Sequence, residues 1–394
     1  MISNVTAPQI MSLEIDGVPY TGFTDPISAS CSVENLCGTF TFTATQPKLN
    51  DFPIKRGDSC RVLVNDTPVV NGFVEEITVQ YDTGNHSITI EGRDKTCDIV
   101  DSTLDGKITF HAPLDLIAIT QQVLTSLGIT GMSVTSNVTL APFSQGEIIS
   151  AEVGQTAFEF IEYYAKKRQV LMTTDGDGNI VFTQSGTEEI NTVIANSETI
   201  LSKPIIKSAS MSLSETKKFN KYIAYAHTNS AAMQIVTDFS QLPVDQEVTM
   251  ISAPAYDVTV RPSRIYNFSS DTSHLNQGDL NTRAIWESNV RRANGFKYSV
   301  VVQGFVAEQD GELWRPNQLV TVVDDVCDID SVLLISSVKY NYSLSGGSET
   351  TLELVDKDSF TVSIIDAPEQ TKKAKVNKQG TIYSLEDFSE NEGE

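Results

Sequence analysis

Short runs that alternate apolar and polar residues fill the first hundred positions. Between residues 8 and 100 these runs are IMSLEIDG, ISASCSVEN, GTFTFTAT, SCRVLVND and HSITIEGR, with turn residues between them. Alternate residues of a strand face opposite sides of a sheet, so each run buries one face. Asn65-Asp66 and residues 82–85 supply the side chains that tight turns favour. The pattern predicts a first antiparallel β-barrel of roughly seven strands over residues 1–103.

The spacing of apolar residues changes after Asp105. A helix is predicted over 113–128, where Pro113 suits the first helical position and Gly128 the stop. Its apolar side is made of Leu116, Ile117, Thr120, Val123, Leu124 and Leu127. A second helix is expected at about 155–168 with a stripe of Phe158, Ile161 and Ala165, followed by a hairpin whose turn is 175–179. Helices mixed with strands predict an α/β insertion over residues 104–202.

Alternation returns in the last third of the chain. The runs IKSASMSLS, KYIAYAHT, DVTVRP and RIYNFS precede a predicted long helix at 278–294, and KYSVVVQGF, LVTVVDD, SVLLISSVKYNYS and TTLELVD follow it. They predict a second β-barrel over 203–365 that contains the helix. Duplication of the two β parts is a hypothesis, because they share no clean sequence repeat. Residues 366–394 lose all periodicity and predict a flexible acidic tail. The expected fold class is therefore mainly β (α+β).

Charge narrows the range of partners. The net charge is −23, with 51 acidic residues against 28 basic ones. Nucleic-acid backbones are bound by Lys and Arg, so strong attraction to DNA is not expected, whereas a surface past which DNA slides is compatible with this charge. No run reaches the ~18 apolar residues that span a bilayer, and the first thirty residues lack a secretion signal. We expect that the chain does not insert into a membrane and that it assembles in the cytoplasm of the host.

The residues that could catalyse a reaction or bind a metal do not show the spacing of a known catalytic or metal-binding motif. The four histidines and five cysteines show no zinc spacing, and Cys31, Cys60 and Cys97 fit buried, inert thiols. Residues 175–179 resemble the start of a calcium loop, but Gly186 stands where a bidentate Glu is required, so a hairpin turn is favoured. Gly106-Lys107 lacks the rest of a phosphate-binding loop. The sequence predicts no catalytic residue, no metal site and no cofactor.

Several segments, in order along the chain, resemble the baseplate hub family of contractile-tailed, Mu-like phages. IEGRDKTCDIVDST (90–103) is similar to the segment that closes the family's first β unit, and LWRPNQLVTVVDD (313–325) is similar to its closing strands. FEFIEYYAKKRQVLMTTDGDGNIVFTQSG is similar to the helix and hairpin of the insertion. The residues that carry the motifs are Gly92, Arg93, Asp94, Lys95, Trp314, Pro316 and Asn317. The family's second α/β part has no clear counterpart here.

The resemblance implies a structural role in the virion tail baseplate and no enzyme activity. A homotrimer would give two tube-like barrels per subunit, hence six in a ring that adapts a six-fold tail tube to a three-fold central spike. The implied partners are the central spike protein, the tail tube protein and baseplate wedge proteins. Genome DNA would pass through the channel without specific binding, and we expect much of the acidic surplus to face it.

Two other functions remain open from the residues alone. A host-binding adhesin would show aromatic clusters in loops, whereas Trp286 and Trp314 lie in or beside predicted regular elements. A tail-associated cell-wall hydrolase would need two titratable groups that converge in a cleft, and the sequence shows no such pair.

Overall fold

The computed structural model describes residues 9–45, 51–84, 86–106, 108–111, 113–143, 148–168, 170–196, 206–228, 249–269, 277–293, 295–307, 311–343, 345–360, 375–376 and 382–383. It divides into a large unit of residues 1–217 and 289–362 and a small unit of residues 218–288 and 363–394. The mainly β prediction is confirmed, since strands make up 50% of the structure and helices 14%. No described helix has the length and apolar character needed to cross a membrane.

The N-terminal strands of the large unit follow the predicted alternation. They are β1 (Met11–Ile15), β2 (Val18–Tyr20), β3 (Phe23–Ser32), β4 (Thr39–Ala44), β5 (Ser59–Val64), β6 (Thr67–Tyr81) and β7 (His86–Asp94). Buried and exposed residues alternate in β4, as expected for a strand with one covered face. Asn65 and Asp66 both have positive φ, of 48° and 64°, which is the geometry of the turn predicted between β5 and β6.

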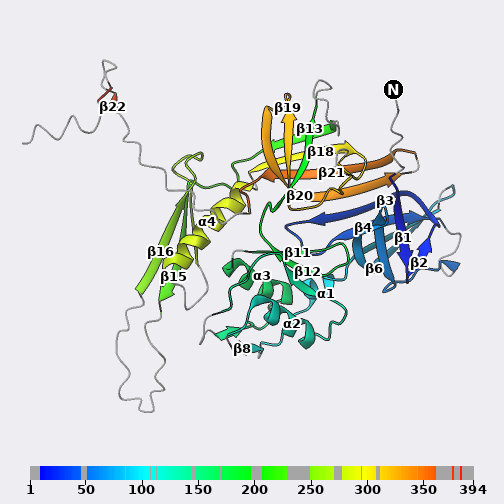
Figure 1. Cartoon of the computed structure of the whole chain (residues 1–394), viewed down its shortest axis with the longest axis horizontal. Helices are drawn as coiled ribbons and strands as arrows, with labels where there is room; N and C mark the ends of the chain where they lie inside the picture. Colours follow the sequence, from blue (N-terminus) through cyan, green and yellow to red (C-terminus); the bar gives the residue numbers. More distant parts are fainter. Residues whose placement is uncertain are drawn as a thin grey trace, which may run out of the picture. The chain divides into compact units, whose positions relative to one another are not determined.

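A second set of strands continues the same sheet. It consists of β13 (Glu188–Ala195), β14 (Ile206–Leu213), β18 (Phe296–Gln303), β19 (Gln318–Asp324), β20 (Ile329–Ser343) and β21 (Gly347–Asp356). The pairing order is β14-β18-β21-β20-β3-β4-β7-β6-β5-β1-β2, with β19 on β20 and β13 on β19. The two sets meet where β20 pairs with β3 (Figure 1). This path is open among the described strands, so closure into two barrels stays a prediction.

The two sets repeat one topology. In the first, β5, β6 and β7 form an antiparallel meander, and β7 pairs with β4, which pairs with β3. In the second, β19, β20 and β21 form the same meander, and β21 pairs with β18, which pairs with β14. The middle strands β6 and β20 are each 15 residues long. The topology therefore supports the duplication that the sequence left as a hypothesis.

A segment with its own hydrophobic core separates the two sets. It contains α1 (Cys97–Asp101), β8 (Thr109–His111), α2 (Leu116–Ser126), β9 (Val134–Ser136), β10 (Ile148–Ser150), α3 (Ala157–Lys167), β11 (Leu171–Thr174) and β12 (Ile180–Thr183). The expected start of α2 at Pro113 is wrong, because the Asp115 side chain accepts a hydrogen bond from the Ala118 N–H at 2.7 Å and caps the helix there. The expected stop is confirmed by Gly128, whose φ is 72°.

The small unit differs from what the alternation predicted. The strands β15 (Lys221–Thr228), β16 (Thr249–Tyr256) and β17 (Ile265–Ser269) form a separate three-stranded sheet, with β15 in the middle. Its core joins that sheet to α4 (Gln277–Ala293) through Tyr222, Ala224, Ala253, Ala255, Leu280 and Ala284. The predicted strand DVTVRP is wrong, because Asp257 accepts hydrogen bonds from the N–H and hydroxyl of Thr259 and forms a turn.

The C-terminal segment is described only in part. Two-residue strands β22 (Lys375–Val376) and β23 (Ile382–Tyr383) pair with each other. The rest of the predicted acidic tail lies outside the described residues.

A glycine of β7 tests the packing of the first set of strands. A Cβ on Gly92 would stand 2.2 Å from the Phe40 ring and 2.2 Å from the Phe73 carbonyl oxygen. We expect Gly92→Ala to lower the free energy of unfolding by about 1–3 kcal/mol through overpacking. Gly84→Ala is the control, since its nearest neighbour would be 3.8 Å away. Urea denaturation measures both, and equal effects would contradict the packing described.

Candidate functional site

The first family motif lies at the end of β7, where the chain enters α1. Arg93 joins these elements to β6, because its guanidinium binds Glu75 at 2.5 Å and Asp101 at 2.5 Å. Each carboxylate receives two hydrogen bonds from it. Hydrogen bonds to Asp101 and Glu75 raise the pKa of Arg93, and the bond from Arg93 lowers the pKa of Asp101. Arg93 therefore fastens the insertion to the first set of strands.

Asp94 is a buried acid within the same motif. Its carboxylate accepts a hydrogen bond from the Thr96 N–H at 2.9 Å, and only 1% of the residue is exposed. Burial raises the pKa of Asp94 to about 6, although hydrogen bonds from Thr96 act in the opposite direction. The free energy of unfolding therefore depends on whether Asp94 is protonated.

Lys95 extends from the motif beneath the hairpin β11–β12. The side-chain Nζ of Lys95 donates to the Gly131 carbonyl oxygen at 3.1 Å, and the backbone N–H of Lys95 donates to the Asn71 carbonyl oxygen at 3.0 Å. A Cβ on Gly178 would stand 2.8 Å from the stem of Lys95, so the turn of the hairpin touches that stem directly.

The hairpin turn docks on β5 and β6. Asp175 closes it by accepting from the N–H groups of Asp177 and Asn179, at 3.0 and 2.8 Å. The Asp177 carbonyl oxygen accepts from Asn71 Nδ2 at 3.0 Å, and its carboxylate lies 3.3 Å from Arg61. The pairing of β11 with β12 confirms the hairpin interpretation of 175–179. In the described part of the chain, no group of His, Cys, Asp and Glu is arranged to hold a metal ion.

Gly176 shows how closely the hairpin and β6 approach. A Cβ at this position would stand 1.8 Å from the Pro68 carbonyl oxygen, so no other residue fits without a shift of the backbone. Arg61, Asn71 and Gly176 were missed as site residues from the sequence. Their partners are about a hundred residues away in the chain, and no local pattern marks such a contact.

The second family motif begins in the core of the second set of strands. Trp314 is fully buried, its backbone N–H donates to the Phe305 carbonyl oxygen at 3.2 Å, and its own carbonyl oxygen accepts from the Tyr340 hydroxyl. The Phe305 and Tyr340 rings meet edge to face, with centroids 5.8 Å apart. Trp314 is therefore a packing residue, as its place in the sequence predicted.

Asn317 fastens the start of β19 to the chain that leaves the hairpin. Its backbone has a φ of 73°, in the left-handed region that Asn tolerates. Its Oδ1 accepts from the Gly186 N–H at 2.9 Å and its Nδ2 donates to the Gln184 carbonyl oxygen at 2.8 Å. One side chain thus satisfies two backbone groups of the segment 184–186.

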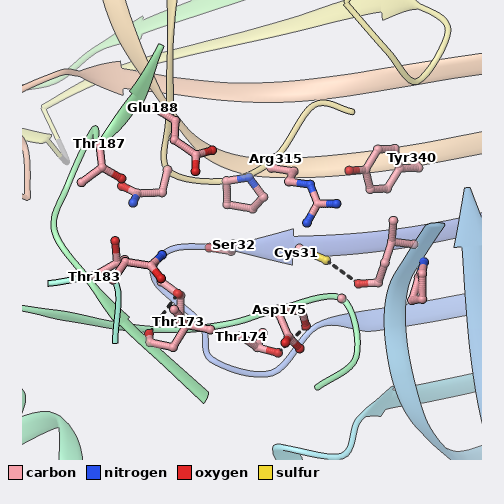
Figure 2. Close-up of a pocket in the computed structure, with 17 residues that line it drawn as sticks. Cys31, Ser32, Thr173, Thr174, Asp175, Thr183, Thr187, Glu188, Arg315 and Tyr340 are labelled. Atoms are coloured by element: carbon pink, nitrogen blue, oxygen red, sulfur yellow. Dashed lines mark hydrogen bonds between the residues drawn. The ribbon is translucent and has the colours of Figure 1, made fainter. Parts of the chain in front are cut away.

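A hollow of about 190 Å³ lies between β3, the hairpin and the second motif (Figure 2). Arg315 points into it toward the strand that carries Cys31 and Ser32, and Pro316 and Asn317 also line it. Residues 92–95 do not line it, although Lys95 touches the same hairpin. Burial raises the pKa of the Cys31 thiol to about 12, and the thiol donates to the Val69 carbonyl oxygen at 3.2 Å, so Cys31 is no nucleophile at neutral pH.

Comparison with known proteins identifies the domains. Three family models match: Mu phage baseplate assembly protein GpP-like, N-terminal, at residues 10–94; baseplate hub protein gp44-like, second domain, at 96–184; and Mu phage baseplate assembly protein GpP, fourth domain, at 278–363. Baseplate hub protein gp44 of Escherichia phage Mu is 24% identical over 386 residues, which is 96% of each chain.

Two solved structures share the fold. The 43 kDa tail protein of prophage MuSo2 from Shewanella oneidensis has a TM-score of 0.73 and 26% identity, over 89% of this chain and 99% of its own. A tail protein from Neisseria meningitidis MC58 has a TM-score of 0.70 and 17% identity, over 90% of this chain and 98% of its own.

The duplicated sheet, its fastened insertion and these matches define a structural protein of a phage tail. The chain belongs to the Mu-type baseplate hub family, whose place is the baseplate of the virion tail.

Asp94→Asn tests the buried acid. Because the folded-state pKa is raised, the folded chain binds the Asp94 proton more tightly than the unfolded chain, and this contribution to stability is lost as pH rises to about 6. Asparagine keeps the acceptor for Thr96 and has no charge. We expect the variant to gain about 1–3 kcal/mol relative to the wild type between pH 4 and pH 7. Urea denaturation across that range measures the difference, and a difference that does not change with pH would refute the account.

Asn317 can be dissected with two substitutions. Asn317→Gly keeps the left-handed backbone and loses both side-chain hydrogen bonds, at a cost of about 1–2 kcal/mol in the free energy of unfolding. Asn317→Ala loses the bonds and also strains the backbone, which adds about 1 kcal/mol. Thermal and urea denaturation should rank wild type above Gly above Ala. Equal stability of all three would show that the 184–186 contact is not needed.

Proposed function

We propose that the chain is a homotrimeric hub that adapts a six-fold tail tube to a three-fold central spike and lines the channel through which DNA passes. The observation that carries this proposal is the duplicated sheet with two matching free edges. Within one chain, residues Ser337–Tyr342 of β20 pair with Ile27–Ser32 of β3. Among the described strands, the corresponding edges of β6 and β14 have no such partner.

Pairing β6 of one copy with β14 of the next would repeat the β20–β3 contact between copies. The two contacts are equivalent because β6 corresponds to β20 in the repeated topology, and β14 corresponds to β3. One edge of β20 pairs first with β19, through Ile329–Leu334, and then with β3, through Ser337–Tyr342. The same edge of β6 pairs first with β5, and the stretch that corresponds to the β3-binding part of β20 is residues 76–81. A head-to-tail contact of this kind gives a ring when the rotation between copies closes, and we propose closure after three copies. Three copies place six similar β units around the axis.

The exposed side of β14 supports the same contact. Met211 and Leu213 pair in register with Tyr298 and Phe296 of β18, so they lie on the face where Tyr298 is buried. Nevertheless 36% of Met211 and 68% of Leu213 are exposed, and every residue of β14 after Ile206 is exposed. Apolar residues that continue a core face onto an uncovered edge are typical of a surface that a partner covers.

We extend the proposal to the domain plan and the partners. Residues 1–103 and 203–365 would act as tube-like barrel domains, with β15, β16 and β17 as a separate sheet within the second range, and 104–202 would be the insertion and 366–394 a flexible tail. The central spike protein, the tail tube protein and the wedge proteins would bind this ring, and the supporting fact is that the matched relatives are baseplate and tail proteins. The net charge of −23 favours passage of DNA without specific binding, and no catalytic role is proposed.

Charges on the exposed edge test the ring. Met211→Asp combined with Leu213→Asp would place two carboxylates where the next copy is expected, so the trimer should dissociate to folded monomers. Val153→Asp is the control, because Val153 is 92% exposed and belongs to neither β6 nor β14. Light scattering gives the mass and circular dichroism checks the fold. A double variant that stays trimeric, or a wild type that stays monomeric even with the spike protein, would contradict the proposal.

A further inference from the structure

The loop between β3 and β4 packs against the start of the insertion. The Gly38 carbonyl oxygen accepts from the Asp94 N–H at 2.8 Å, and the Leu36 carbonyl oxygen accepts from the Thr96 hydroxyl at 3.3 Å. Between these two bonds, the Cys37 thiol donates to the Asp94 carbonyl oxygen at 3.4 Å. The two backbones therefore run side by side in opposite directions at Cys37.

Cys97, the first residue of α1, lies next to this thiol. Its side chain lies beside that of Cys37, close enough for the two thiols to interact. Only 3% of Cys97 is exposed, whereas Cys37 is half-buried and meets solvent. The bonds at 36–96 and 38–94 place the loop that carries Cys37 alongside the residues that lead into α1, so both thiols lie where these two backbones meet.

The other cysteines have no such neighbour. Cys31 is bonded to the Val69 carbonyl oxygen, Cys60 is buried in the core of the strands, and Cys327 lies in the turn between β19 and β20. All five cysteines are free thiols in the structure. Cys31 is close enough to influence Cys37 electrostatically, so it is the competitor that an experiment must separate.

We propose that Cys37 and Cys97 are a built-in oxidation site and form a disulfide when the virion baseplate leaves the reducing cytosol for an oxidising medium. Reduced thiols persist in the cytosol, and disulfides persist outside it. The bond would join the β3–β4 loop to α1, beside the place where Arg93 already joins β6 to α1. It would add a covalent connection between the first set of strands and the insertion.

The oxidant in this reaction is a small-molecule disulfide such as oxidised glutathione. The exposed Cys37 thiolate attacks one of its sulfur atoms, which gives a mixed disulfide and releases one thiol. Cys97 then loses its proton to solvent and attacks the Cys37 sulfur, which forms the protein disulfide and releases the second thiol. Two electrons pass from the protein to the small disulfide. In the mixed disulfide the Cys37 thiol no longer acts on Cys97, but burial still raises the pKa of Cys97, so the second step becomes faster as pH rises.

The test uses the full-length chain, purified with reductant and then incubated with oxidised glutathione at pH 7 and pH 8.5. We expect the intact mass to fall by two hydrogen atoms, faster at the higher pH, and non-reducing peptide mapping to join the peptides of Cys37 and Cys97. The thermal midpoint should rise by several degrees, and reductant should reverse the change.

Variants assign the bond. Cys37→Ser should abolish the cross-link, and because Cys37 is half-buried this variant can be checked for its fold by circular dichroism. Cys31→Ser and Cys327→Ser should form the cross-link as the wild type does. A persistent glutathione adduct on Cys37, a cross-link to Cys31, or an unchanged mass at pH 8.5 in the folded chain would each overturn the proposal.

Discussion

The backbone ladder between β20 and β3 is the contact on which the rest of the large unit depends. It makes one continuous sheet from two sets of strands that are separated in the sequence by the whole insertion. Because of it, the buried residues of both sets form a single hydrophobic cluster, from Met11 to Leu354. The same ladder fixes how one β unit follows the other, and it therefore defines the geometry that a ring of copies would repeat.

A second constraint keeps the insertion in place on this sheet. Its hairpin is bound on one side by Lys95, Asn71 and Arg61, and the chain that leaves it is bound by Asn317. Apart from the Arg61–Asp177 ion pair, these contacts are close backbone approaches and side-chain-to-backbone hydrogen bonds, which are directional and fix the position of the hairpin. Lys95 of the first motif and Asn317 of the second thus hold the hairpin and the chain that leaves it in a fixed relation to the sheet.

The sequence predicted local structure well and long-range structure poorly. Alternation located β1, β3, β4, β5 and β7, and the apolar stripe placed the long helix at 278–294, within a residue of its observed ends. It failed at DVTVRP, where Val258 and Val260 mimic a strand while Asp257 closes a turn. It also placed β15, β16 and β17 in the second β unit, because period-two alternation does not say which sheet a strand joins. The motif residues were found through family resemblance, whereas the pairing of Arg61 with Asp177 had no signal in the sequence.

Electron cryo-microscopy of the assembled chain tests the central claim most directly, since it images the contact between copies. The account predicts a three-fold ring of six similar β units, in which β6 of each copy pairs with β14 of the next. A particle of another symmetry, or a three-fold particle that leaves the β14 edge facing solvent, would contradict it.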